Sequence, residues 1–168
     1  MLLWTLAHHV RVRVEYTIDI EKHDFHGLAH PTEKTTRETG AEVVISSTKR
    51  RGRTRAQLVE LLEDRGFVGT VRGMTPEHVS KMPGGSLYRA DSRGHEIYAW
   101  LQSASLYGID VKAFVILDDD SDMAHLADRL IKTTFDTGLL NEHVDRAIEM
   151  LRAASSLIVI PTNLPNAS

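Results

Sequence analysis

The stretch Phe114–Met123, FVILDDDSDM, places four aspartates directly after an apolar run. These acids are Asp118, Asp119, Asp120 and Asp122. Carboxylates this close in sequence repel one another, so a fold that gathers them needs a compensating cation or a wide opening to solvent. Hard cations such as Mg²⁺ prefer carboxylate oxygens as ligands. A single acid would be enough to cap a following helix, so the cluster predicts a Mg²⁺ site.

Two other apolar segments also end in polar groups. The segment 41–47, AEVVISS, ends at Ser46 and Ser47 and leads into the basic run KRRGRTR at 49–55. The alternating segment 10–20, VRVRVEYTIDI, ends near Asp19 and Glu21. Strand ends are often polar for solubility alone. In a parallel sheet, however, such ends meet at one edge, where hydroxyls and cations can neutralise phosphoryl oxygens beside a bound metal.

The elements that would position these groups predict an α/β fold around a mainly parallel sheet. Period-two alternation and apolar β-branched runs indicate strands at 10–20, 41–47, 67–72 and 111–117, and a last strand or docked tail at 157–160. Helical periodicity and capping residues indicate helices at 54–65 and 93–107, one leaving the acidic turn at Met123, and one from Asn141. A short helix is expected at Thr75–Pro76, and the polar segment Lys22–Arg37 is expected to be mostly loop.

Composition narrows the class of protein. The 168 residues, 42% apolar and 26% charged, are typical of a water-soluble globular domain, and the net charge of −3 gives no general argument for nucleic-acid binding. The absence of cysteine excludes disulfides, thiolate zinc sites and cysteine nucleophiles. The first ten residues do not resemble a signal peptide, and no apolar run is long enough to cross a bilayer. A cytoplasmic protein with no membrane partner is expected.

Four segments in order, GAEVVISST, RGHEIYAWL, FVILDDDSDM and the run to Thr137-Gly138-Leu139, resemble the haloacid dehalogenase (HAD) superfamily. The resemblance is closest to the HAD domains of Swiss Army Knife RNA repair proteins and covers about residues 38–152. It implies a Rossmannoid core, a parallel sheet flanked by helices with no large cap domain. The chain would then divide into a divergent N-terminal strand and loop at 1–37, a HAD-like core at 38–156 and a tail at 157–168, within one domain.

The resemblance also assigns roles to the polar groups. Ser46 would supply the phosphate-binding hydroxyl, with Ser47 as its alternative and Lys49 and Arg50 as further substrate contacts. The basic residue that steadies the phosphoryl group would be Arg93, with Lys81 or Arg89 as substitutes. The metal ligands would be Asp118 and Asp119, supported by Asp122.

The first strand departs from the family, whose strand ends in Asp-x-Asp-Gly, a nucleophile followed by a general acid/base. The nearest match is Asp19-Ile20-Glu21-Lys22, with Asp19 as nucleophile and Glu21 as acid/base. Lys22 replaces a glycine whose backbone freedom the turn usually needs. The interval from Asp19 to Ser46 also looks short for an intervening helix and a cap.

The expected function is therefore a Mg²⁺-dependent phosphohydrolase acting on a phosphate monoester, with a nucleic-acid end as one candidate substrate. The alternative is a catalytically inactive or truncated HAD-like module that binds a phosphorylated ligand or partner. A receiver-like domain would need an acceptor aspartate on a middle strand, and 41–47 has none.

Two further patterns carry competing interpretations. His23, His26 and His30 are spaced to bind zinc if they lie on a helix, although histidine-rich loops are more often only solvated. The basic residues of 49–55 are equally compatible with ordinary solvated surface. Because they follow the presumed phosphate-binding strand end, they could instead contact a polynucleotide backbone, with an affinity that falls steeply with salt.

Overall fold

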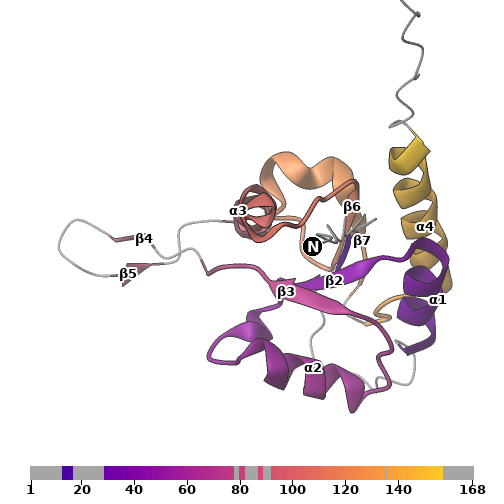
Figure 1. Cartoon of the computed structure of the whole chain (residues 1–168), viewed down its shortest axis with the longest axis horizontal. Helices are drawn as coiled ribbons and strands as arrows, with labels where there is room; N and C mark the ends of the chain where they lie inside the picture. Colours follow the sequence, from indigo (N-terminus) through magenta and orange to yellow (C-terminus); the bar gives the residue numbers. More distant parts are fainter. Residues whose placement is uncertain are drawn as a thin grey trace, which may run out of the picture.

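A five-stranded, entirely parallel sheet in the order β3-β2-β1-β6-β7 forms the centre of the protein (Figure 1). The structure, a computed structural model, describes residues 13–16, 29–77, 80–81, 87–88, 92–134 and 136–156. The strands are β1 (Arg13–Tyr16), β2 (Glu42–Ile45), β3 (Val71–Met74), β6 (Phe114–Asp118) and β7 (Leu130–Lys132). The order confirms the predicted α/β, HAD-like fold.

Helices on both faces cover this sheet (Figure 1). They are α1 (Ala29–Thr39), α2 (Arg55–Glu63), α3 (Arg93–Ala104) and α4 (Asn141–Ser156), with short 3₁₀ segments η2 (Thr48–Arg50), η3 (Ser105–Tyr107) and η4 (Ala124–Arg129). The predicted cap of α2 is confirmed, because Thr54 and Gln57 form a reciprocal capping box. The predicted end of the 93–107 helical segment is confirmed at Gly108, which adopts the left-handed conformation with φ 69°.

Alternate residues of the central strands face two cores, as the period of two requires. On β2 and β6, Val43, Ile45, Val115 and Leu117 pack with the apolar stripes of α2 and α4. The intervening Ile116 packs instead beside α3 and η4 with Ile97 and Met123. Val44 faces Trp100 of α3. The sheet is therefore buried on both faces, which explains its continuous apolar strand sequences.

The segment expected to be mostly loop contains helix α1, so that prediction was wrong. Pro31 lies in the first turn, where a proline needs no hydrogen-bond donor. The helix is polar and lacks an apolar stripe, which hid it from periodicity. It is held by tertiary contacts instead: Thr35 is fully buried, and Lys34 and Glu38 pair with Asp145 and Arg152 of α4. The interval between β1 and β2 does therefore accommodate a helix.

Other differences arise where pairing with distant strands overrides local signals. Thr75 does not start a helix, because its N–H donates to the Ile45 carbonyl and continues the β2–β3 ladder. A small antiparallel hairpin follows, β4 (Ser80–Lys81) with β5 (Leu87–Tyr88), and projects from the body of the protein (Figure 1). The strand expected at 67–72 begins only at Val71, the residue that pairs with Val43.

The segment after the acidic turn was also predicted incorrectly. It forms the 3₁₀ segment η4 rather than an α-helix, and it leads directly into β7, a strand that was not predicted. β7 is only three residues long, and its pairing with β6 could not be read from so short a run.

Strand order places a topological switch between β1 and β6, since β2 and β3 lie on one side of β1 and β6 and β7 on the other. Tyr16, at the end of β1, is level with Ile45 and with Leu117. The next residues on the two flanking strands, Ser46 and Asp118, therefore lie at matching heights beside the end of β1. Open α/β sheets bind ligands at such a point.

Between β3 and α3, the described residues are 75–77, the small hairpin and residue 92, and they form no large cap domain, as predicted. None of the helices in the described ranges is long and apolar enough to span a bilayer. The boundary drawn between residues 37 and 38 falls within α1, and the division into segments stays a prediction.

Candidate functional site

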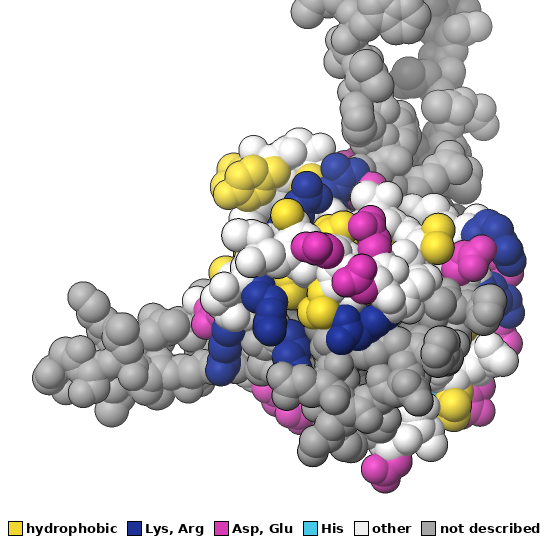
Figure 2. Space-filling view, turned by 90° about the horizontal axis from the view of Figure 1, so that it is seen from below, with side chains coloured by type: hydrophobic (Ala, Val, Ile, Leu, Met, Phe, Trp, Pro, Cys, Tyr) yellow, Lys and Arg dark blue, Asp and Glu magenta, His cyan; other side chains and the backbone are white. Residues whose placement is uncertain are grey.

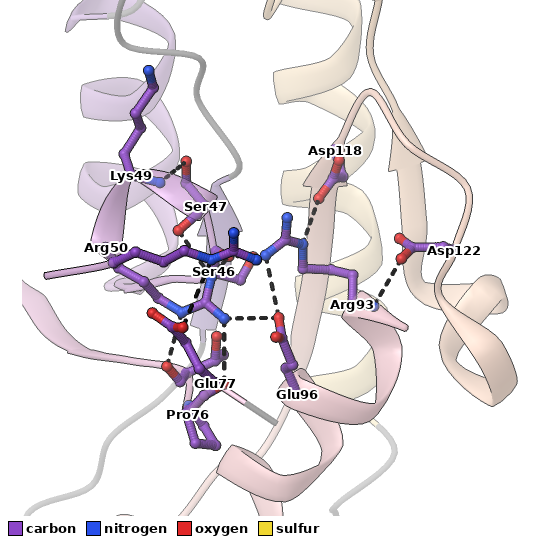
Figure 3. A network of polar contacts seen from close by, with 12 residues as sticks. Ser46, Ser47, Lys49, Arg50, Pro76, Glu77, Arg93, Glu96, Asp118 and Asp122 are labelled. Atoms are coloured by element: carbon purple, nitrogen blue, oxygen red, sulfur yellow. Dashed lines mark hydrogen bonds and ion pairs between the residues drawn. The ribbon is translucent and has the colours of Figure 1, made fainter. Parts of the chain in front are cut away.

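The carboxyl end of β2 is held by two arginine side chains (Figure 3). Ser46 and Ser47 are buried, and the carbonyl of Ser46 accepts hydrogen bonds from Nη1 of both Arg50 and Arg93. The hydroxyl of Ser47 accepts the N–H of Lys49 at 3.3 Å. The structure thus places both predicted hydroxyl residues at the sheet edge, with their backbone fixed by cations.

The buried guanidinium of Arg50 links β2, β3 and α3. Its Nε donates to the Thr75 carbonyl at the end of β3, and Nη1 donates to the carbonyl of Ser47 at 2.9 Å as well as to that of Ser46. Nη2 donates to Glu96 of α3 at 2.7 Å. Burial lowers the pKa of Arg50, and the Glu96 carboxylate opposes that shift. Although Arg50 was predicted to contact substrate, its guanidinium is turned into the protein, and we assign it a structural role.

Arg93 spans the end of β1. Its Nη1 donates to the Ser46 carbonyl beyond β2, and its Nε lies 3.8 Å from Oδ2 of Asp118 at the end of β6. Within the described part of the chain, Nε is buried and has no hydrogen-bond partner. Since β1 lies between β2 and β6, this cation occupies the edge where the three strands end.

The acidic loop after β6 is fixed against the start of α3. Oδ2 of Asp122 accepts the backbone N–H of Arg93 at 2.9 Å, and the Asp122 carbonyl accepts the N–H of Gly94 at 3.1 Å. A Cβ at Gly94 would lie 1.9 Å from the Met123 carbonyl oxygen, so only glycine permits this approach. Asp118 is buried, and its Oδ1 accepts the N–H of Asp120 at 2.9 Å. Asp119 is exposed at the same edge.

Two carboxylates of this loop suit Mg²⁺ in their chemistry. Mg²⁺ usually keeps several waters and uses only one or two protein carboxylates together with substrate phosphate oxygens. Asp118 and Asp119, adjacent at the strand end, supply that donor set. Asp122 already uses one oxygen to cap α3. No group of three or more potential ligands is assembled among the residues that the structure describes.

Around the site, several basic side chains already have partners. Arg53 and Arg55 donate to the carbonyls of Lys49 and Val71, and Arg51 forms an ion pair with Glu77 at 3.7 Å. On the face shown in Figure 2, a group of acidic side chains has Lys and Arg side chains beside it, so the two signs are intermixed. Lys49 extends away from the buried Arg50–Glu96 pair (Figure 3). The surface offers local cations rather than a broad basic field.

Comparison with known protein families identifies the family of this chain. Residues 8–144 of the 168 match the HAD domain in Swiss Army Knife RNA repair proteins. The chain belongs to this HAD family. Membership places it, in general terms, among HAD-type phosphohydrolases. No curated protein and no solved structure matches the chain.

Several residues predicted for this HAD site fall where the structure gives no side chain. Asp19, Glu21 and Arg89 lie outside the described residues, as do His23 and His26 and the tail at 157–160. Lys81 lies in β4 and His30 in α1, without described side chains. Their roles stay predictions.

Sequence reasoning missed three residues that hold the site together. Glu96 contacts both arginines. Gly94, which has no side chain, lets the acidic loop pack against the start of α3. Lys132 donates to the Ser121 hydroxyl at 2.7 Å. Glu96 had a detectable signal, because it follows Arg93 by three residues and shares the buried stripe of Ile97 and Trp100. A charged pair on a buried helix face needs partners. Lys132 had no such signal, since β7 itself was not predicted.

Proposed function

We propose that this HAD-family protein is a Mg²⁺-dependent phosphohydrolase that acts on a phosphate monoester in the cytoplasm. The observation that carries the proposal is the position of Arg93, whose guanidinium reaches from the Ser46 carbonyl to Asp118 across the end of β1. A cation fixed at a topological switch point, between a hydroxyl pair and adjacent carboxylates, suits a phosphoryl group.

Each residue of the edge has a separate task in this proposal. Arg93 binds the phosphoryl oxygens and keeps them oriented toward the end of β1. The Ser46 hydroxyl donates to another oxygen, with Ser47 as the alternative, and Lys49 approaches from the rim. Because Arg93 is nine-tenths buried and its Nη1 is anchored on a carbonyl, little reorganisation is needed when the substrate binds.

The balance of charge supports a bound metal. The edge carries four cations, Arg50, Arg93, Lys49 and Lys132, and five carboxylates, those of Glu96, Asp118, Asp119, Asp120 and Asp122, which leaves an excess of one negative charge when all are ionised. A phosphate monoester adds negative charge. Asp118 and Asp119 would hold Mg²⁺, which when bound supplies Lewis-acid stabilisation of the phosphoryl oxygens.

The nucleophile assignment rests on the resemblance of the first strand. Asp19 would attack phosphorus and form an aspartyl-phosphate, while Glu21 gives a proton to the departing alcohol. Glu21 would then take a proton from the water that hydrolyses the aspartyl-phosphate. Asp19 follows Tyr16, the last described residue of β1, by three positions in the sequence.

A nucleic-acid end is the substrate that we propose within this class. The family is described by its occurrence in RNA repair proteins, and the exposed Arg51 lies two residues from Lys49 at the rim. Hydrolysis of a 3′- or 5′-phosphorylated oligonucleotide should then lose efficiency between 50 and 200 mM salt more steeply than hydrolysis of an aryl phosphate. Equal salt dependence of the two substrates would restrict the proposal to small phosphate monoesters.

Release of phosphate from an aryl phosphate tests the activity. We expect turnover in Mg²⁺ that is lost in EDTA, abolished by Asp19→Asn and reduced at least about 100-fold by Asp119→Asn. Asp145→Asn is the matched control, because Asp145 is an exposed acid on α4 whose only recorded partner among the described residues is Lys34. Activity that survives Asp19→Asn would rule out this nucleophile.

A second candidate is favoured by the sequence of the first strand, in which Lys22 stands at the family's glycine position. On this alternative the protein binds a phosphorylated ligand or partner without turning it over. Inorganic phosphate would then bind in Mg²⁺, and Asp119→Asn would abolish the binding, with no hydrolysis of any phosphate monoester. Measurable turnover by pure protein would exclude it.

A further inference from the structure

The carboxylate of Glu96 lies buried between two arginines (Figure 3). Its Oε2 accepts Nη2 of Arg50 at 2.7 Å and Nη1 of Arg93 at 3.2 Å. Both guanidiniums also donate to the single carbonyl of Ser46. Two buried cations that converge on one carbonyl repel each other, and the Glu96 charge offsets that repulsion.

The two arginines depend on Glu96 to different degrees. Arg50 has further anchors, the carbonyls of Ser47, Thr75 and Pro76, and its side chain is 1% exposed. Among the described residues, the Arg93 guanidinium donates hydrogen bonds to the Ser46 carbonyl and to Glu96. Arg93 also lies at the rim, with a side chain that is 10% exposed. Loss of Glu96 would therefore release Arg93 before it released Arg50.

Asp118 is the other charged neighbour of Arg93. Its Oδ2 and the Arg93 Nε form an ion pair at 3.8 Å, which is too long for a hydrogen bond, so a small rotation could bring the guanidinium closer to that carboxylate. A closer pairing with Asp118 after loss of Glu96 would compete more strongly with a metal ion for that carboxylate. Glu96 thus keeps Arg93 oriented and limits how closely it approaches Asp118.

We propose that Glu96 is a positioning residue of the phosphate site, which acts through Arg93 by fixing its guanidinium beside the Ser46 carbonyl and limiting its approach to Asp118. The proposal rests on the proposed function for its consequence, since Arg93 is the group that meets the phosphoryl oxygens. Glu96 itself is fully buried against the two guanidiniums. Its spacing of three residues from Arg93 on the first turn of α3 fixes the pair within one element.

Whether Glu96 fixes the Arg93 guanidinium can be tested without substrate. The readout is the NMR signal of the Arg93 Nε–Hε group, which is assigned by its loss in Arg93→Lys. We expect one sharp, slowly exchanging signal in the wild-type protein and a shifted or broadened signal in Glu96→Gln. The control is Glu42→Gln, which removes a carboxylate from the Arg72 pair at the other end of β2 and should leave the Arg93 signal unchanged. An unchanged Arg93 signal in Glu96→Gln would overturn the proposal.

The consequence for ligands is tested by calorimetric titration of inorganic phosphate and of Mg²⁺. Glu96→Gln should weaken phosphate binding at least about tenfold and raise the Mg²⁺ concentration that phosphate binding requires. Arg93→Ala should weaken phosphate binding by a similar factor. The double variant, Arg93→Ala with Glu96→Gln, should bind phosphate no more weakly than Arg93→Ala alone, because Glu96 acts through Arg93. If the two losses of phosphate affinity multiply in the double variant, Glu96 does not act through Arg93.

Folding and function are kept separate in this design. If Glu96→Gln does not fold, Arg50→Gln with Glu96→Gln removes one buried charge of each sign, and the same Arg93 signal is read in that variant. If the wild-type protein neither binds nor releases phosphate, the proposed function fails. The NMR comparison still decides whether Glu96 holds Arg93.

Discussion

The backbone N–H of Arg93 donates a 2.9 Å hydrogen bond to the carboxylate of Asp122, 29 residues further along the chain. Ser92, the residue before α3, makes no side-chain capping bond, so Asp122 provides the cap from the acidic loop. Asp122→Ala should lower the free energy of unfolding by about 1 kcal/mol, while Asp122→Asn, which keeps an acceptor oxygen, should lose less. Urea denaturation measures both variants.

The same pair separates capping from metal binding. If Asp122 acts mainly as a cap, Asp122→Asn keeps nearly wild-type Mg²⁺ affinity. Should Asp122→Asn weaken Mg²⁺ as strongly as Asp119→Asn, then Asp122 is a ligand first and its cap is secondary. Titration of Mg²⁺ on folded protein gives the comparison.

Gly94→Ala should separate the acidic loop from α3. The new Cβ would lie 1.9 Å from the Met123 carbonyl oxygen, a backbone atom that cannot rotate away, so the variant should lose at least about 2 kcal/mol of stability. Mg²⁺ affinity should fall with it. Gly73→Ala is the control, since its Cβ would stand 3.4 Å from Nε1 of Trp100, an ordinary contact. Equal effects at the two glycines would argue against the tight approach.

Arg50→Met should be among the most destabilising single changes at the site. Removing Arg50 leaves the fully buried Glu96 without its 2.7 Å partner, and breaking a buried ion pair on one side costs about 3–5 kcal/mol. Arg51→Ala, at an exposed neighbour 3.7 Å from Glu77, should change stability by no more than about 0.5 kcal/mol. Thermal or urea unfolding distinguishes these outcomes. Near-equal stability of the two variants would show that Arg50 does not stabilise the junction of β2, β3 and α3.

Local signals in the sequence sufficed for the elements that carry their own pattern. The apolar runs of β2 and β6, the N-cap at Thr54 and the stripe of α3 were predicted because burial and capping act within a few residues. The meeting of Ser46 and Asp118 at one edge followed from the rule that parallel strands share a carboxyl end. Arg93, at the start of a helix, was assigned to the site by the family resemblance instead. The parallel-strand rule predicts which residues lie at one edge of the sheet, but it does not predict which side chains contact one another.

What the sequence could not predict depends on partners far along the chain. Helix α1 is polar and is held by α4, and β7 exists through its pairing with β6. Arg50 lies in a basic run that is typical of exposed surface, yet its guanidinium is buried because acceptors from β2, β3 and α3 converge on it. Periodicity and charge runs contain no information about such convergence.

The measurement that tests the account most directly is phosphate release from an aryl phosphate by pure protein in Mg²⁺, compared between the wild type, Asp119→Asn and the control Asp145→Asn. The account predicts turnover in the wild type and in the control, and at least about 100-fold less in Asp119→Asn. Wild-type turnover that continues undiminished in EDTA or in Asp119→Asn would contradict a metal-dependent phosphoryl site at the edge spanned by Arg93.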